Sequence, residues 1–564
     1  MCGIAGYVQL NQKKVSFDSL QRMTQALEHR GPDDQGYFYT SQMGLGHRRL
    51  SIIDLSVSGR QPIYNEDKTV AAIFNGEIYN FQEIREDLIK KHHQFATRTD
   101  TEVIVHAYEE WGIDCLRKFN GMFAIVIYSV LEQKLFLVRD RLGIKPLYYY
   151  EDEGNFAFAS EIKALLKYPY FKKELDLDTL QQYLGLGYIL APKSIFKNVK
   201  KLLPGYYLSI DLIKKETRRE SFWEIPLNGN GYPLKSEEEY LEELDHLLER
   251  ETFYRLISDV PVGAFLSGGV DSSTVVAYMV KSGHRKVRTF SVGTPTKANN
   301  ENIYARKVAE ILGTQHTQFY LSPQDIKNYI LKIPQFCDEP YADSSFIPIH
   351  ILSGKAREQG MKVLLSGDGG DELFFGYPNY HLRALARYIS QVVPQPVRKR
   401  MLNFADLFSF SNKFYKGICA IGCDNYLESI FYITGNGLSI SEMSQVLFDR
   451  RFDVRQTIFY PLIQRHQNLP FYEQLMLLDI NTYMVDNNLV RMDRGGMSCG
   501  VEIRVPLISH HVVEFAMNLP FRLKYKNKIR KYLLKMALSQ FLPWELIDRP
   551  KHGFDPLPLS DWFR

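Results

Sequence analysis

The sequence predicts two domains of different architecture, an α+β domain followed by a doubly wound parallel α/β domain. Three observations support this division. The chain of 564 residues is longer than one typical domain. Roughly the first 170 residues consist mainly of strand-length apolar runs, and beyond residue 235 such runs alternate with helical segments. We expect the boundary between about 210 and 235, with domains spanning residues 2–215 and 235–564.

Short apolar runs define the elements of the first domain. Residues 70–74 and 123–128 have the length of buried strands. Residues 135–138 follow closely enough to form a hairpin with the second of these strands. Residues 100–111 carry apolar side chains four positions apart, which indicates a helix. This part of the chain therefore predicts sheets with few helices.

The second domain begins with a helix start signal. Ser236 and Glu239 have the spacing of a capping box and precede an amphipathic run. Residues 260–266 then predict a buried strand, and residues 272–282 predict a helix. Two further strands with polar loops after them are expected at residues 289–293 and 363–366. Strands that alternate with helices form parallel sheets covered on both faces.

Composition excludes several classes of protein. Lys+Arg number 69 against 65 for Asp+Glu, a net charge of +4 without the clustered basic face of a nucleic-acid binder. Six cysteines are too few for a disulfide scaffold, and no apolar stretch approaches the ~18 residues of a membrane span. The N-terminus lacks the pattern of a signal peptide. We expect a cytoplasmic multi-domain enzyme with no nucleic-acid or membrane partner.

Cys2 has a distinctive position directly after the initiator methionine. Removal of Met1 would leave a thiol and a free α-amine on one residue. Because the reference pKa of an α-amine is about 7.7, part of it is neutral at pH 7 and can act as a base without a histidine. Taken alone, Cys2 is better explained as a small buried residue at the start of a strand.

Asn75 and Gly76 allow two interpretations. Asn-Gly between apolar runs is the commonest hairpin turn. Alternatively, the Asn75 amide and the Gly76 N–H form an oxyanion hole. Arg49 and Asp100 are typical of surface ion pairs, but together they match the carboxylate and ammonium groups of an amino acid.

The order of five motifs in the first domain resembles the class II glutamine amidotransferases, which have the N-terminal nucleophile fold, an αββα sandwich. The motifs are Cys2-Gly3-Ile4, Arg30-Gly31-Pro32-Asp33, His47-Arg48-Arg49-Leu50-Ser51-Ile52, Asn75-Gly76-Glu77-Ile78-Tyr79-Asn80 and Asp100-Thr101-Glu102. The resemblance implies that Cys2 attacks the glutamine carboxamide and that Asn75 and Gly76 stabilise the oxyanion. It also implies that glutamine is held by Arg49, Asn75, Gly76, Glu77 and Asp100.

Two glycine-rich loops stand out in the second domain. Residues 267–273 (Ser-Gly-Gly-Val-Asp-Ser-Ser) lie between a predicted strand and a helix, where backbone N–H groups can bind phosphate, although an ordinary tight turn is an alternative. The loop lacks the lysine of a Walker A motif. Residues 366–372 (Ser-Gly-Asp-Gly-Gly-Asp-Glu) form an acidic loop after another strand. Its carboxylates could share Mg²⁺ with the pyrophosphate of ATP, or Asp368 or Asp371 could cap a helix.

These loops resemble the ATP-pyrophosphatase domain of glutamine-hydrolysing asparagine synthetases. The resemblance implies that Mg²⁺ is held by Asp271 and Asp371, that Asp368 acts in acyl-adenylate formation, and that Lys551 stabilises charge in that step. The implied contacts to ATP phosphates are Ser267, Gly268, Gly269, Asp271 and Ser272. The implied contacts to the nucleoside or its phosphate are Leu266, Val292, Ser366 and Gly367.

The same resemblance implies small-molecule partners: glutamine, ATP and a carboxylate acceptor. Aspartate is the favoured acceptor, with a uronic acid of a nucleotide sugar in surface-polysaccharide synthesis as the alternative. A non-catalytic scaffold and an enzyme that adenylates a tRNA base are the rivals outside this chemistry. A homodimer and an internal ammonia tunnel are further expectations.

The chain departs from the family pattern in three places. Ser509 stands where members often have an aspartate, and Asp368 stands where some have a glutamate. Many relatives continue past Arg564, so we expect a naturally shorter form or a truncated chain.

Overall fold

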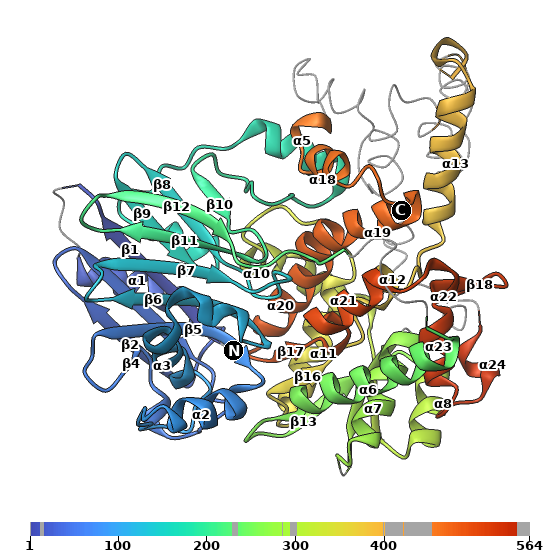
Figure 1. Cartoon of the computed structure of the whole chain (residues 1–564), viewed down its shortest axis with the longest axis horizontal. Helices are drawn as coiled ribbons and strands as arrows, with labels where there is room; N and C mark the ends of the chain where they lie inside the picture. Colours follow the sequence, from blue (N-terminus) through green and yellow to red (C-terminus); the bar gives the residue numbers. More distant parts are fainter. Residues whose placement is uncertain are drawn as a thin grey trace.

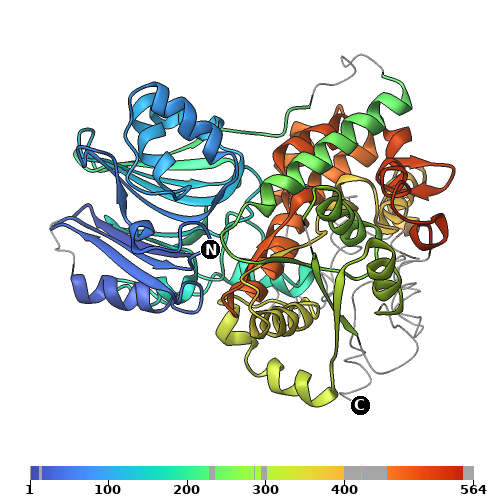
Figure 2. The same ribbon diagram turned by 90° about the horizontal axis from the view of Figure 1, so that it is seen from below.

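The computed structural model describes residues 2–549 except 12–15, 228–234, 285, 294–301, 399, 401–420 and 422–453. These residues form two parts that lie side by side, one built on two antiparallel sheets and the other on a parallel sheet (Figures 1 and 2). No helix in the described part of the chain is long and apolar enough to cross a membrane.

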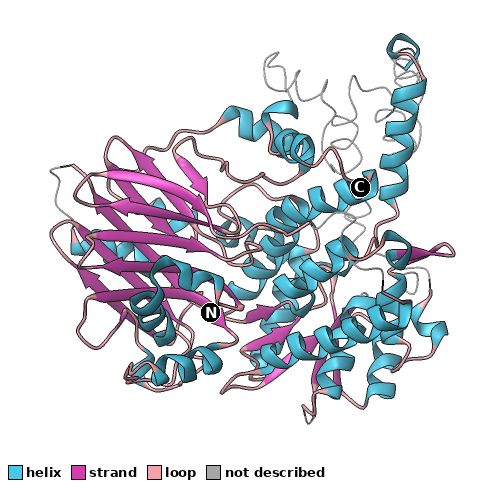
Figure 3. Cartoon of the chain, in the orientation of Figure 1, coloured by secondary structure: helices cyan, strands magenta, loops and turns pink. Residues whose placement is uncertain are grey.

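The N-terminal domain contains two stacked six-stranded antiparallel sheets (Figure 3). The first has the order β10-β8-β9-β1-β3-β2, and the second has the order β12-β11-β7-β6-β5-β4. The strands of the first sheet are β1 (Gly3–Gln9), β2 (Asp34–Tyr39), β3 (Met43–Arg49), β8 (Tyr148–Asp152), β9 (Asn155–Ala159) and β10 (Val199–Lys201). Those of the second are β4 (Ile63–Tyr64), β5 (Val70–Ile78), β6 (Gly121–Ser129), β7 (Lys134–Arg139), β11 (Tyr206–Asp211) and β12 (Glu216–Ser221).

Side chains alternate between the two faces of each strand, so each sheet packs against the other sheet on one face and against helices on its other face, which gives four layers. In β1, Ile4 and Val8 point into the core between the two sheets, whereas Ala5 and Tyr7 point toward the helices outside. Helices α1 (Phe17–Gln25) and α4 (Ile162–Leu165) pack on the outer face of the first sheet. Helices α2 (Phe81–Lys90) and α3 (Glu102–Trp111) pack on the outer face of the second. The αββα sandwich implied by the sequence motifs is confirmed, as is the expected hairpin, formed by β6 and β7.

The C-terminal domain contains a five-stranded sheet in which every pair is parallel, in the order β15-β14-β13-β16-β17. Its strands are β13 (Val262–Phe265), β14 (Arg288–Gly293), β15 (Gln315–Tyr320), β16 (Val363–Leu365) and β17 (Glu502–Arg504). The chain runs outward from β13 to one edge and then returns to β16 on the other side. The predicted doubly wound sheet is therefore confirmed, with its topological switch point between β13 and β16.

Helices cover both faces of this sheet. One face, which carries Val262, Ala264 and Leu365, packs against α6 (Glu237–Leu256), α7 (Val270–Lys281) and α23 (Tyr532–Leu538). The other face packs against α11 (Phe346–Glu358) and α20 (Leu489–Met497). The capping box is present, because Ser236 accepts from the Glu239 N–H and the Glu239 carboxylate accepts from the Ser236 N–H. Other described helices are α5 (Leu177–Leu186), α8 (Asn302–Leu312), α9 (Pro323–Ile330), α12 (Gly370–Leu373), α13 (Asn379–Val392), α19 (Phe471–Asn481) and α21 (His510–Asn518).

The two domains share one apolar core at their junction. Leu50, Tyr79 and Met122 of the N-terminal domain belong to the same buried cluster as Leu507 and Ile508 of the C-terminal domain. Such a contact fixes the relative position of the pockets that each domain carries.

Candidate active sites

A small pocket opens at the junction end of the N-terminal sandwich. It is lined by Cys2, Arg49, Gly76, Glu77 and Asp100 together with loop residues that follow β3. Residues up to 98 positions apart in the sequence thus meet, because β1 begins where β3 and β5 end. The structure brings together the residues that the sequence motifs assigned to glutamine.

Asn75 does not itself line the pocket but lies directly behind Cys2, which does. The Cys2 backbone N–H donates to Asn75 Oδ1 at 3.0 Å. Asn75 is fully buried, and its Nδ2 has no hydrogen-bond partner among the described residues. Because a buried amide donor normally has an acceptor, this group is suited to a ligand oxygen. Burial raises the pKa of the Cys2 thiol, so the thiol needs a base before it can attack.

Gly76 is part of a strand, and the hairpin interpretation of Asn75-Gly76 is wrong. Strand β5 continues to Ile78, and Gly76 lies opposite Phe123 of β6. A Cβ atom at Gly76 would lie 2.0 Å from the Met122 carbonyl oxygen, and φ is +155°. Only glycine fits this close approach of two backbones.

Two carboxyl groups lie on the side of the pocket that faces the C-terminal domain. Asp100 Oδ2 accepts from the Ile78 N–H at 2.9 Å, and burial, with the charge of Glu502 nearby, raises the pKa of Asp100 to about 6. Burial also raises the pKa of Glu77 well above its usual value. Arg504 of β17 pairs with Glu77 at 3.2 Å. The C-terminal domain therefore supplies part of the electrostatic environment of this pocket.

Arg49 is held by backbone carbonyls of the loop that closes the pocket. Its guanidinium donates to Ser56 O at 2.7 Å, to Ile53 O at 3.3 Å and to Asp54 O. Only 5% of the residue is exposed. The side chain thus fixes the loop and places a positive charge at the pocket wall.

A second cavity, of about 450 Å³, lies at the carboxyl ends of β13 and β16. This is the topological switch point, where ligands bind in open α/β sheets. The cavity wall includes all but one of the described residues that the resemblance assigned to ATP and metal. They are Leu266, Ser267, Gly269, Asp271, Ser272, Val292, Ser366, Gly367, Asp368 and Asp371.

The Ser-Gly-Gly loop is fixed by its own hydroxyl groups. Ser272 Oγ accepts from the Ser267 N–H at 3.2 Å and lies 3.0 Å from Ser267 Oγ. Gly268 has φ of +73°, does not line the cavity, and accepts from Arg549 Nη2 at 2.9 Å through its carbonyl oxygen. Helix α7 begins at Val270, so its N-terminus points at the cavity and favours an anion.

Asp271 and Asp371 meet across the two loops, joined by a lysine that the sequence analysis missed. Lys531 Nζ lies 2.6 Å from an oxygen of each carboxylate. Two hard oxygen donors at one point suit Mg²⁺, which would displace the Lys531 ammonium group that lies between the two carboxylates. The pair therefore fits the metal that the sequence motifs implied.

Asp368 is paired with Arg491, a second residue missed in the sequence. Arg491 Nη2 donates to Asp368 Oδ1 at 2.7 Å, and its Nη1 donates to Ser345 Oγ at 2.9 Å and Asp343 Oδ2 at 3.2 Å. Nearby, Glu372 accepts from the Asn488 amide at 2.6 Å, and burial raises the pKa of Glu372 to about 7. Neither Arg491 nor Asn488 belongs to a motif. Lys551 lies outside the described residues.

Helix α20 connects the two pockets. Arg491 faces the larger cavity, and two residues later Asp493 accepts from Arg30 of the N-terminal domain at 2.8 and 3.0 Å. Arg494 pairs with Glu161 at 2.8 Å. Arg30 has no exposed surface, and its Nε donates to the Cys2 carbonyl oxygen at 3.1 Å. One buried network therefore runs from the backbone of Cys2 to α20.

Ser509, where an acidic residue was expected, caps a helix. Its side chain accepts from the Val512 N–H at the start of α21. The Ser509 hydroxyl accepts a hydrogen bond from a backbone N–H of the first turn, as the carboxylate of an aspartate at this position would also do.

Comparison with known proteins agrees with this geometry. A family model for the glutamine amidotransferase domain matches residues 1–223, and a model for asparagine synthase matches residues 243–564. Glutamine-hydrolyzing asparagine synthetase 1 of Bacillus subtilis is 34% identical over 574 residues, which cover 100% of this chain and 88% of that protein. Putative glutamine-hydrolyzing asparagine synthetase 2 of Methanocaldococcus jannaschii is 38% identical over 443 residues, covering 73% of this chain and 84% of that protein. The chain therefore belongs to the glutamine-hydrolysing asparagine synthetase family, whose members are ligases that form carbon–nitrogen bonds.

Proposed function

We propose that the protein converts aspartate, glutamine and ATP into asparagine, glutamate, AMP and pyrophosphate through β-aspartyl-AMP. The glutaminase occupies residues 2–215 and the synthetase residues 235–564. The observation that carries the proposal is the pairing of two pockets, one around Cys2 and the other at the switch point of the parallel sheet, in one member of this family.

In the first pocket, Cys2 attacks the carboxamide carbon of glutamine once Met1 has been removed. The freed α-amine accepts the thiol proton, which the raised pKa of the buried thiol makes necessary. Asn75 Nδ2 and the Gly76 N–H donate to the oxyanion, which then collapses to a thioester and releases ammonia. Water hydrolyses the thioester to glutamate.

Recognition of glutamine uses the charged wall of the same pocket. Arg49 lies near the α-carboxylate, and Asp100 and Glu77 lie near the α-ammonium. Although burial raises the pKa of Asp100 to about 6, that value is still below 7, so this carboxyl is mostly ionised at neutral pH and available to a cation.

In the second cavity, a side-chain oxygen of aspartate attacks the α-phosphorus of ATP and pyrophosphate leaves. Leu266, Val292, Ser366 and Gly367 contact the nucleoside or its phosphate. The phosphates bind to Ser267, Gly269, Asp271 and Ser272, where the N-terminus of α7 favours negative charge, whereas Gly268 shapes the loop without lining the cavity. Asp271 and Asp371 would hold Mg²⁺, which when bound would neutralise charge on the leaving pyrophosphate.

Asp368 positions Arg491, the residue that binds the acceptor carboxylate. Its ion pair with Arg491 places a guanidinium at the cavity wall, where Asp343 and Ser345 restrain it. A fixed guanidinium suits a carboxylate of the acceptor. Lys551 is assigned to charge stabilisation on the family motif alone. Ammonia then attacks the acyl carbon and AMP leaves.

Acceptor choice is tested by comparing pyrophosphate release with aspartate and with a nucleotide-linked uronic acid, each with glutamine and ATP. We expect release that depends on aspartate, with one asparagine formed per pyrophosphate. The Cys2→Ala variant supplied with an ammonium salt serves as a control, because it should still form asparagine. Pyrophosphate release that requires the uronic acid and ignores aspartate would overturn the assignment of the acceptor.

A further inference from the structure

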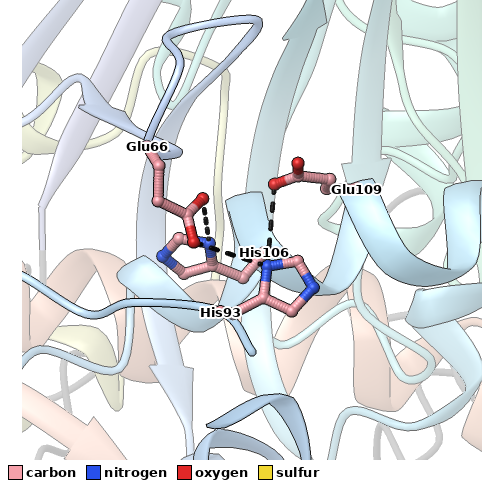
Figure 4. A group of neighbouring side chains, drawn as sticks. All are labelled: Glu66, His93, His106 and Glu109. Carbon is pink, nitrogen blue, oxygen red and sulfur yellow. Dashed lines mark ion pairs between the residues drawn. The ribbon is translucent and has the colours of Figure 1, made fainter. Parts of the chain in front are cut away.

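Two histidines and two glutamates gather on the N-terminal domain at a place that lines neither pocket. They are Glu66 in the turn between β4 and β5, His93 after α2, and His106 and Glu109 on α3 (Figure 4). One potential ligand atom of each residue lies within 4.8 Å of those of the other three. Three separate segments of the chain thus direct nitrogen and oxygen donors to one point.

The spacing of these donors matches a tetrahedral metal site. Zn–N and Zn–O bonds of about 2.0–2.2 Å place neighbouring ligand atoms about 3.3–3.6 Å apart. His106 Nδ1 lies 3.2 Å from Glu66 Oε2, and His93 Nδ1 lies 3.6 Å from Glu66 Oε1 and 3.7 Å from Glu109 Oε2. These distances involve both oxygens of Glu66, and the four ligand atoms lie within 4.8 Å of one another, so the side chains would move inward to surround one ion.

His106 provides an independent indication of a ligand. It is 1% exposed, and neither of its ring nitrogens makes a hydrogen bond with the described residues. Its Nδ1 points toward Glu66, as Figure 4 shows. A buried imidazole without hydrogen bonds is costly, and a metal ion at Nδ1 would satisfy it.

The surroundings supply the outer contacts that metal-binding side chains usually have. Glu102 lies 3.7 Å from His106 Nε2, and Glu110 lies 3.5 Å from His93 Nε2, so each imidazole has a carboxylate behind it. The Asn65 amide donates to Glu109 Oε2 at 3.0 Å. These outer carboxylates lie behind the two imidazoles, and the arrangement orients both rings toward the centre of the cluster.

We propose that Glu66, His93, His106 and Glu109 bind one Zn²⁺ ion that stabilises the N-terminal domain. Nitrogen and carboxylate donors in tetrahedral spacing favour zinc over Mg²⁺, which prefers six oxygen ligands. Glu66 and Glu109 are exposed, so the ion can reach the site from solvent. The site goes beyond the synthetase activity, because it links the β4–β5 turn and α2 to α3 and contributes nothing to either reaction.

The test uses the purified full chain, stripped with a chelator and titrated with ZnCl₂ by calorimetry. The variants are His93→Gln and Glu109→Gln, each of which removes a ligand from the accessible side of the site. His92→Asn is the matched control: His92 is exposed, has φ of +75°, and asparagine tolerates that conformation. All variants keep every cysteine and every carboxylate outside the cluster, so zinc bound elsewhere on the chain contributes equally to each measurement.

We expect the wild type and His92→Asn to bind one more equivalent of zinc than His93→Gln and Glu109→Gln. At a free zinc concentration 100-fold above Kd, the melting temperature of the N-terminal domain should rise by about 5–10 °C in the first pair and by much less in the second. Equal zinc stoichiometry and equal melting shifts in all four proteins would overturn the proposal. So would a melting temperature that changes with pH but not with zinc, because the cluster would then be a set of ion pairs.

Discussion

Replacement of Asn75 by alanine isolates the oxyanion contact in the glutaminase pocket. The change removes Nδ2, the buried donor without a partner among the described residues. Loss of one such donor typically lowers kcat by 10²–10³, or about 2.7–4 kcal/mol of transition-state stabilisation. Because the oxyanion develops in the transition state and the tetrahedral intermediate and not in bound glutamine, we expect the KM for glutamine to change little.

The same substitution has a smaller structural effect that must be separated from catalysis. The Cys2 N–H loses its acceptor at 3.0 Å, and a buried unsatisfied group costs about 1–3 kcal/mol of stability. Glutamate release is therefore measured well below the melting temperature, beside asparagine synthesis from an ammonium salt. The ammonia-dependent rate should stay near that of the wild type. A glutaminase kcat within about threefold of the wild type would refute the role of Asn75 as an oxyanion donor.

Three further predictions concern other parts of the molecule. Asp271→Asn should abolish pyrophosphate release yet spare basal glutamine hydrolysis, and pyrophosphate release that persists would contradict the metal role. For glutamine, kcat/KM should fall by a further factor of about ten per pH unit below pH 6, beyond the loss of the neutral α-amine of Cys2, because Asp100, whose pKa burial raises to about 6, also loses its charge there; a profile that does not steepen between pH 7 and 5 would exclude Asp100 as the ammonium ligand. Asp493→Asn should lower stability by about 3–5 kcal/mol, since it leaves Arg30 partly unpaired in the interior, and should raise the glutamate released per asparagine formed. An unchanged ratio and melting curve would argue against coupling through this pair.

Residues next to strand ends could be predicted from the sequence. Asp271 and Asp371 lie 100 positions apart, yet each follows a strand-length apolar run. In a parallel sheet such positions meet at one edge, so the sequence predicted both loops and the fold around them. The strand order was not predictable from these runs, because it depends on how distant strands pair.

Residues outside motifs could not be predicted. Lys531 lies 260 positions from Asp271, and Arg491 lies 123 from Asp368, each as a single basic residue near or within a helix. The same holds for the contact between Arg30 and Asp493, 463 positions apart. Local sequence does not specify which of many exposed or buried cations meets a given carboxylate.

The local turn preference of Asn75-Gly76 also suggested one structure, a hairpin turn, that is wrong. Asn-Gly favours a hairpin turn, but pairing with β6 across nine positions keeps β5 extended through Asn75 and Gly76. The histidines show no metal-ligand spacing in the sequence, because His93 follows α2 and His106 lies on α3, and only the packing of these two segments brings them together. Tertiary contacts decided both cases.

The acyl-adenylate is the central claim, and an oxygen label tests it directly. Aspartate with ¹⁸O in its side-chain carboxylate is incubated with the full chain, glutamine, ATP and Mg²⁺. The masses of AMP, pyrophosphate and inorganic phosphate are then measured by mass spectrometry. Attack on the α-phosphorus transfers one labelled oxygen to AMP and leaves pyrophosphate unlabelled. Label in inorganic phosphate or pyrophosphate, with AMP unlabelled, would contradict the account.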